Sequence, residues 1–381
     1  MPVEYLDLPF DEAIKFFRDK VNIPTARWTD LWQDMHAKGF MIAGAMKADL
    51  LSDFRGAVDR AISEGTSLEA FQKDFDTIVE KHGWSYNGGR GWRSRVIYET
   101  NVHTAYAAGR WQQMTDPDVM SRRPYLQYRH GDSAAPRPEH LAWDGLVLPA
   151  DDPWWDTHYP PNGWGCKCSV FSLSERDMAR LGKDAPDTAP DGGTYEWTDK
   201  ATGQIRKVPD GIDPGWAYNA GKAADESYKL LADKFDTLPT DIARQWMKSY
   251  VREPAFEGFV DGRITGEFPV AVMDTQMQAQ IGAERQTVWL SSETLAKNKA
   301  AHDELALADY RSLPERIDTA QLVVQDGGQT LVFIRANGNI YHAAVKTTRT
   351  GTANYLTSYR LSGEADVARM RKKGTVVRNE W

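Results

Sequence analysis

Cysteine is almost absent from this sequence. The 381 residues include two cysteines, Cys166 and Cys168, and both lie within the stretch "PPNGWGCKC". Two cysteines cannot build the disulfide framework of a small secreted protein, and a bridge between positions so close in the chain would be strained. We therefore predict that the two thiols are reduced.

Long apolar runs are absent as well. No run approaches the roughly 18 residues that a membrane-spanning helix requires. The beginning of the sequence, "MPVEYLDLPFDEAIKFF", has no basic segment that leads into an apolar core. We expect no membrane partner, and we expect the chain to be cytoplasmic in the cell that makes it.

Basic residues are in deficit over the chain as a whole, which has a formal net charge of −8. The deficit is uneven, because residues 285–381 contain 14 Lys and Arg against 10 Asp and Glu, a balance of +4 that leaves −12 for the remainder. The C-terminal segment is therefore the part of the chain that is expected to meet a polyanion.

The first 115 residues have the pattern of helices. Apolar side chains recur every four residues between positions 46 and 62, which is typical of an amphipathic helix. Thr66 and Glu69 then have the spacing of a capping box, which predicts that a second helix begins there and continues to "HGW". A third helix is expected over residues 92–114. We interpret residues 1–115 as a helical N-terminal region.

Residues 116–225 have a different composition, rich in Pro, Gly, Asp and Trp. The strand candidates are short, "YLQYR" and "LVLP", and "TYEWTDKATGQIRKV" is a hairpin candidate. A loop-rich region of this length is uncommon inside a compact domain unless it is functional or held in place by something. Helical patterns resume in residues 226–284, which we interpret as a helical connector followed by a linker.

The last part of the chain, residues 285–381, is expected to form a domain of its own. The strand "TVWL" precedes a helix capped by Ser291 or Ser292 and a shorter helix, "LALADYRSLPERI". Four strand candidates follow, separated by the hairpin signals "DGG", "NGN" and "TRTG". The chain is thus predicted to be an α+β multidomain protein, whose C-terminal domain is a four-stranded antiparallel sheet packed on helices.

The cysteine stretch admits two interpretations. In the first, Cys166, Cys168 and His140 hold a structural zinc ion, with Asp144, Asp156 or His158 as a further ligand, since zinc accepts such N/S/O sets. In the second, the thiols are small buried apolar groups, and the prolines and Trp164 hold an irregular loop. The residues alone favour the second interpretation.

Five ordered motifs resemble the Mu F-like family of phage minor head, or head morphogenesis, proteins. They are "LPFDEAIKFFRDK", "RSRVIYETNVHTAYAAGRW", "GDSAAPRPEHLAWDGLVL", "PPNGWGCKC" and "DGIDPGWAYNAGKA". The resemblance covers roughly residues 5–225 and implies that the polar signature of the family is Asp132, Arg137, His140, Asp144, Cys166 and Cys168. Lys167 stands where the family usually has an arginine, which keeps the charge and loses the bidentate geometry.

The C-terminal segment has the residue types that metal-independent RNA cleavage needs, namely a proton-transfer group and cations against the phosphate. His302 ends a lysine-containing helix, and Lys346 is expected on the same strand face as His342 and Ala344. In the next strand Leu356, Ser358 and Arg360 are expected to share one face. Taken singly, a histidine on such a charged helix is more often solvated than catalytic, and Lys346 is also consistent with an outward charge that protects a sheet edge.

The stretch from "VWLSSETLAKNKAAH" to "YLTSYR" resembles the phage-associated branch of the barnase–EndoU–colicin–RelE-like nucleases. That resemblance implies His302, Tyr310, Lys346 and Ser358 as catalytic positions of an RNase-like toxin domain that needs no cofactor.

The two resemblances together predict a phage minor head protein that lies inside the virion near the portal and passes through the host cytoplasm during assembly. They imply portal, major capsid or scaffold proteins as partners, RNA as substrate, and contact with packaged DNA. The alternative is a structural head protein whose C-terminal domain binds without catalysis. A zinc-dependent enzyme is the least favoured interpretation.

Overall fold

The chain divides into two compact units, Met1–Glu226 and Ser227–Trp381. The computed structural model describes residues 10–133, 135–224, 232–327 and 329–381. Within the described residues no helix is both long enough and apolar enough to cross a lipid bilayer.

The described helices of the first unit are α1 (Asp11–Arg18), α2 (Met35–Lys38), α3 (Ala48–Ser63), α4 (Leu68–His82), α5 (Arg90–Thr115), α6 (Pro117–Met120), α7 (Pro138–Ala142), α8 (Trp155–His158), α9 (Glu175–Arg180) and α10 (Ala220–Ala223), with a 3-10 turn η1 (Trp28–Asp30). Its strands are β1 (Val21–Asn22), β2 (Gly39–Phe40), β3 (Tyr125–Arg129), β4 (Val147–Pro149), β5 (Ser169–Leu173), β6 (Thr194–Thr198) and β7 (Ile205–Pro209).

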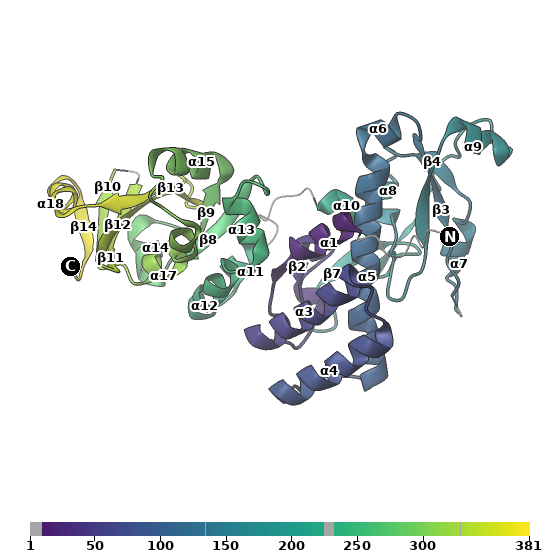
Figure 1. The fold of residues 1–381 in the computed structure, drawn as a ribbon, viewed down its shortest axis with the longest axis horizontal. Coiled ribbons are helices and arrows are strands. Elements are labelled where there is room, and N and C mark those ends of the chain that lie inside the picture. The colour runs from purple at the N-terminus through teal and green to yellow at the C-terminus, as the bar shows by residue number, and fades with distance from the viewer. Residues whose placement is uncertain (1–9, 134, 225–231, 328) are drawn as a thin grey trace, which may run out of the picture. The chain divides into compact units, whose positions relative to one another are not determined.

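The three long helices α3, α4 and α5 lie where the sequence predicts them, and α5 is the long helix of this unit in Figure 1. The predicted cap of α4 is wrong by one residue, because the side chain of Ser67 accepts the backbone N–H of Ala70.

Glycine lets neighbouring segments approach α5 closely. A Cβ on Gly109 would lie 2.8 Å from the backbone nitrogen of Ala13 in α1.

The loop-rich middle of the first unit is built on a three-stranded antiparallel sheet of order β4-β3-β5. The predicted strands "YLQYR" and "LVLP" correspond to β3 and β4, and the predicted hairpin is β6 paired with β7. Little regular structure is available here, so aromatic side chains form the core. The buried residues of this core are Trp111, Met114, Leu126, Tyr128, Trp143, Leu148, Ala150, Trp154, Trp155, Tyr159, Val170, Val208, Ile212, Trp216 and Ala217.

The described helices of the second unit are α11 (Ala232–Thr237), α12 (Thr240–Tyr250), α13 (Pro254–Val260), α14 (Thr275–Ile281), α15 (Ser292–Ala301), α16 (Leu307–Arg311), α17 (Leu313–Asp318) and α18 (Glu364–Lys373). Its strands are β8 (Glu267–Val272), β9 (Thr287–Ser291), β10 (Leu322–Asp326), β11 (Gln329–Ala336), β12 (Asn339–Thr347), β13 (Asn354–Ser362) and β14 (Thr375–Asn379).

The predicted four-stranded antiparallel sheet is wrong in size and type. The four predicted strands exist as β10 to β13, but they are part of a seven-stranded sheet of order β14-β10-β11-β12-β13-β9-β8, in which β13 and β9 run parallel. Strand β8 begins in the stretch "REPAFEGFVDGRITGEFP", for which the sequence allows either a linker or short strands. It contains Pro269, which sits beside a register irregularity in an edge strand, as proline in a sheet usually does.

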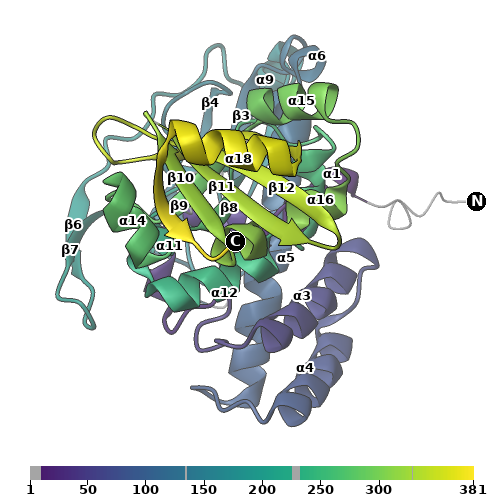
Figure 2. The ribbon, with the colours of Figure 1, turned by 90° about the vertical axis from the view of Figure 1, so that its left-hand side faces the viewer.

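Helices cover both faces of this sheet. On one face Val367 of α18 packs against Leu322, Val324, Leu331, Phe333 and Ala344, and Figure 2 shows α18 lying across strands β10 to β12. On the other face Arg316 of α17 contacts the hydroxyl of Tyr359, and its guanidinium lies over the ring of Tyr341. The side chains of β12 and β13 are therefore divided between two separate environments.

Candidate metal centre

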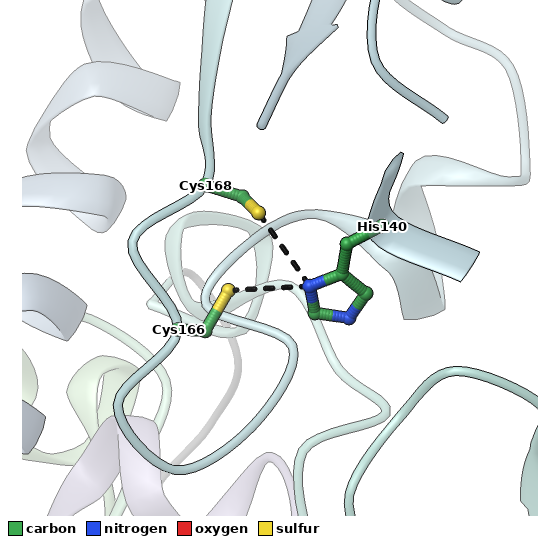
Figure 3. A group of neighbouring side chains, drawn as sticks. All are labelled: His140, Cys166 and Cys168. Carbon is green, nitrogen blue, oxygen red and sulfur yellow. Dashed lines mark hydrogen bonds between the residues drawn. The ribbon is translucent and has the colours of Figure 1, made fainter. Parts of the chain in front are cut away.

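Three side chains with metal-ligand chemistry converge in the first unit. His140 comes from the short helix α7, whereas Cys166 and Cys168 come from the loop between α8 and β5. The Nδ1 atom of His140 lies 3.8 Å from Sγ of Cys166 and 3.5 Å from Sγ of Cys168, and all three donor atoms lie within 4.8 Å of one another. Figure 3 shows the imidazole edge directed toward both sulfur atoms.

The orientation of the His140 ring is set by its other nitrogen. The Nε2 atom lies 2.8 Å from the carbonyl oxygen of Gly211, which can only accept a hydrogen bond. The proton must therefore be on Nε2, and the lone pair of Nδ1 faces the thiols. The ring is buried, with 2% exposed, and it stacks on Trp143 with 5.1 Å between ring centroids. These contacts hold the imidazole in one tautomer and one position.

Close backbone approaches hold the cysteine loop against its neighbours. A Cβ on Gly131 would lie 2.0 Å from the carbonyl oxygen of Lys167, between the two cysteines. A Cβ on Gly163 would lie 2.3 Å from a carboxylate oxygen of Asp213. Larger residues would force these segments apart, and the two glycines explain why the loop packs so tightly.

The two thiols are electrostatically unequal. A hydrogen bond from Cys166 holds the pKa of Cys168 well below that of an ordinary thiol despite partial burial. The hydrogen bond with Cys168 and burial raise the pKa of Cys166. The two titrations are therefore coupled, and Cys168 loses its proton more readily than Cys166.

Backbone amides also point at the sulfur atoms. The N–H groups of Asn162 and Cys168 donate toward Sγ of Cys166, and that of Gly131 donates toward Sγ of Cys168. The hydroxyl of Tyr128 donates to Oδ1 of Asn162 at 2.9 Å, and Nδ2 of Asn162 has no hydrogen-bond partner among the described residues. The surroundings of the cysteines are polar and rich in donors, although they are buried beside an aromatic core.

The further ligands considered from the sequence lie elsewhere. Asp144 accepts the backbone N–H of His130 and pairs with Arg129. Asp156 pairs with Lys222, and His158 stacks on the ring of Trp154 at 4.4 Å. Among the described residues the cluster consists of His140, Cys166 and Cys168.

The residues predicted to be catalytic in the second unit do not form one site. Tyr310 is buried against Tyr359, which pairs with Ala343 and faces α16 and α17. Ser358 pairs with Ala344, which packs against α18 on the opposite face. Lys346 lies two residues beyond Ala344 in the same strand, on the same face as Ser358, and is exposed.

His302 lies in the segment between α15 and α16. It follows α15 directly, and its Nδ1 atom lies 3.5 Å from a carboxylate oxygen of Glu304. Burial raises the pKa of Tyr310 to about 12, with smaller contributions from Asp309 and Glu304. Glu304 is thus in contact with His302 and contributes to the raised pKa of Tyr310. Lys346 and Ser358 lie on the opposite face of the sheet from Tyr310.

Sequence reasoning missed the groups that position the metal-ligand cluster. Gly211, Tyr128 and Asn162 carry no charge, and their roles depend on a carbonyl, a hydroxyl and an amide that many loops contain. The stretch "PDGIDPGW" was a weak signal for a tight turn at Gly211, whose φ is 78°.

Comparisons with known proteins agree over most of the chain. The model of a family described as "Phage Mu protein F like protein" matches residues 52–171, which include the whole cluster. The chain is 35% identical over 407 residues to the "Putative capsid assembly protein F" of Escherichia phage Mu, covering 92% of this chain and 90% of that protein. It is 30% identical over 367 residues to the "Mu-like prophage FluMu F protein" of Haemophilus influenzae, covering 83% and 88%. No solved structure matches the chain.

Proposed function

The chain belongs to the Phage Mu protein F-like family, and on that premise we propose that it is a capsid assembly protein that acts in the morphogenesis of a phage head. The observation that carries the proposal is the alignment with the capsid assembly protein of phage Mu, which covers 92% of this chain. Such coverage necessarily extends far into the second unit, which begins at Ser227. Both units are therefore part of what is shared with that relative.

We further propose that the protein is a minor, internal component of the head, located beside the portal. The partners would be portal and major capsid or scaffold proteins, and the packaged DNA would lie close by. The resemblance of the motifs to minor head proteins supports this location. It predicts few copies per particle and no surface exposure in an intact virion.

Deletion of the gene from the phage that encodes it tests the assembly role. We expect few or no DNA-filled heads by electron microscopy, and normal heads when the intact chain is supplied from a plasmid. Antibody labelling of purified virions tests the location, with labelling expected only after the particles are opened. Normal heads and titre without the gene would contradict the assembly role, whereas labelling over the whole surface of intact particles would contradict the internal location.

A second proposal concerns the second unit, for which RNA cleavage without a metal is predicted. The observation that favours it is the contact between His302 and Glu304, because a half-buried imidazole held by a carboxylate is suited to proton transfer. The hydroxyl of Tyr310 has no hydrogen-bond partner among the described residues and lies near the same carboxylate. Lys346 and Ser358 are left out of this site.

Incubation of the purified full chain with labelled single-stranded RNA and tRNA in the presence of EDTA tests this second proposal. Cleavage in EDTA would support it. Retention of RNA without cleavage would show that the chain binds RNA and does not cut it. Cleavage only after metal addition would point to a metal-dependent enzyme instead.

A further inference from the structure

We propose that His140, Cys166 and Cys168 bind one zinc ion, which cross-links the loop-rich middle of the first unit. The proposal concerns a ligand that the assembly role does not require. It rests on the geometry of the three side chains and their immediate neighbours, and its failure would leave the proposed function untouched.

The distances between the donor atoms fit a zinc ion. Typical Zn–S and Zn–N bond lengths of about 2.3 and 2.0–2.1 Å place the sulfur and nitrogen ligands of a tetrahedral site about 3.6 Å apart. The structure places Nδ1 of His140 at 3.8 Å from one sulfur and at 3.5 Å from the other. The cluster already has the dimensions of two edges of a zinc tetrahedron.

The second nitrogen of His140 has the partner that a metal-bound imidazole needs. Metal-ligating histidines nearly always donate their other N–H to a carbonyl, a carboxylate or water, which fixes the tautomer and the ring. Nε2 of His140 donates to the buried loop carbonyl of Gly211 at 2.8 Å. The lone pair of Nδ1 is thereby directed at the space between the two sulfur atoms.

His140 by itself can accept a hydrogen bond from only one of the two thiols that face it. Nδ1 has one lone pair and can accept one S–H proton, so the second thiol has no equivalent acceptor on His140. The backbone N–H groups of Asn162 and Gly131 donate toward the sulfur atoms. Hydrogen-bond donors around a sulfur atom favour a metal-bound thiolate, because a thiolate accepts hydrogen bonds and does not donate them.

The ligand types select among metals. Two thiolates and one imidazole suit zinc, whereas magnesium and calcium require oxygen ligands. A pocket of about 600 Å³ is lined by both cysteines together with Lys167 and His103. Solvent can thus supply the fourth ligand of the tetrahedron.

The ion would stabilise a region that has little regular structure. His140 belongs to α7, the two cysteines precede β5, and Gly211 follows β7, so the cluster joins three segments that are distant in the sequence. Metal binding of this kind contributes directly to folding because the unfolded chain lacks the site. This explains why a long loop-rich segment can pack as one body.

Metal analysis of the reduced full-length protein tests the proposal. We expect close to one zinc per chain, or one equivalent after reloading with Zn²⁺, and thiolate-to-cobalt absorption after loading with Co²⁺. Zinc affinity should fall at least tenfold in Cys166→Ser, Cys168→Ser and His140→Asn. His158→Asn serves as the control, because His158 is a buried histidine of the same region that does not belong to the cluster. This variant should bind zinc as tightly as the unaltered protein.

A mercurial titration of the unaltered chain covers the case in which the variants fail to fold. The sequence has two cysteines, so zinc released when the thiols are blocked comes from this pair. Release of one equivalent, together with a lower melting temperature after chelation, is the expected result. The proposal is overturned if the reduced, reloaded chain holds no zinc, or if Cys166→Ser and Cys168→Ser bind it as tightly as the unaltered protein.

Discussion

Arg137 and Asp213 form an ion pair with 2.5 Å between nitrogen and oxygen, although 76 residues separate them in the chain. The same carboxylate oxygen accepts the backbone N–H of Trp164 at 2.8 Å. The pair therefore joins the beginning of α7, the cysteine loop and the segment after β7. These are the same segments that meet at His140, so the ion pair and the cluster support each other.

Asp213→Asn is predicted to destabilise the first unit by about 1–2 kcal/mol, because it removes the charge from two hydrogen bonds in a half-buried site. Urea unfolding of the full chain, followed by tryptophan fluorescence, measures the effect. The control Asp191→Asn alters an exposed carboxylate and should change stability little. If the two variants had the same free energy of unfolding, the ion pair would make no net contribution to the stability of the first unit.

Local signals in the sequence were sufficient for most individual elements. Helices α3 and α4 and strands β10 to β13 follow from apolar periodicity and turn residues, which act over a few neighbouring positions. The turn between β11 and β12 has Asn337 and Gly338 at φ values of 52° and 78°, as the Asn-Gly signal predicts. Strands β8, β9 and β14 join the sheet through distant pairings that no local pattern encodes.

The prediction of strand faces was wrong at one point for a physical reason. Leu356 pairs with Val345 and Ser358 pairs with Ala344, so a register shift places Leu356 and Ser358 on opposite faces. Thr357 is the extra residue, and its hydroxyl donates to the carbonyl of Ala344. Such a bulge breaks the alternation of a strand, and the sequence carries no marker for it.

The candidate metal centre was partly accessible from the sequence. Ligand chemistry was sufficient to single out His140, Cys166 and Cys168, which the structure brings together. Their alignment depends on the Gly211 carbonyl and on the close approach of Gly131 to Lys167, and both are tertiary contacts. The residues predicted to cleave RNA could not be assigned to one side of the sheet, because the sequence does not show which helix covers which face.

Buried His342 predicts an acid-sensitive second unit. The side chain is 5% exposed, and neither ring nitrogen has a hydrogen-bond partner among the described residues. The pKa of His342 is lowered to about 4, and burial is the main cause. The nearby Arg360 also lowers this pKa, and its effect is larger than the opposite effect of Asp366. The folded state therefore keeps the imidazole neutral at a pH where the unfolded chain binds a proton.

The sign follows from proton linkage. Above the unfolded pKa of about 6.5 the residue contributes no pH dependence, and between about 6.5 and 4 stability falls as pH falls. We expect a loss of about 2 kcal/mol between pH 7 and pH 5 that is absent in His342→Phe, because phenylalanine can retain the stacking on Phe333. Urea unfolding at both pH values measures it. The same pH dependence in both proteins would assign the acid sensitivity to other groups.

The last prediction separates the two faces of the sheet in the second unit. If His302 transfers a proton during RNA cleavage, His302→Ala lowers the rate by about 10²–10⁴-fold. Its melting temperature should change little, because the side chain is 26% exposed. Tyr310→Phe removes a hydroxyl on the same side and keeps the ring packed against Tyr359.

Lys346→Ala and Ser358→Ala serve as matched controls, since both residues lie on the opposite face and should leave the rate nearly unchanged. Rates measured on labelled RNA at low salt distinguish the faces. A loss in Lys346→Ala as large as that in His302→Ala would contradict the division into faces. If the unaltered chain does not cleave RNA, the nuclease is excluded, and binding becomes the remaining role of the second unit in head assembly.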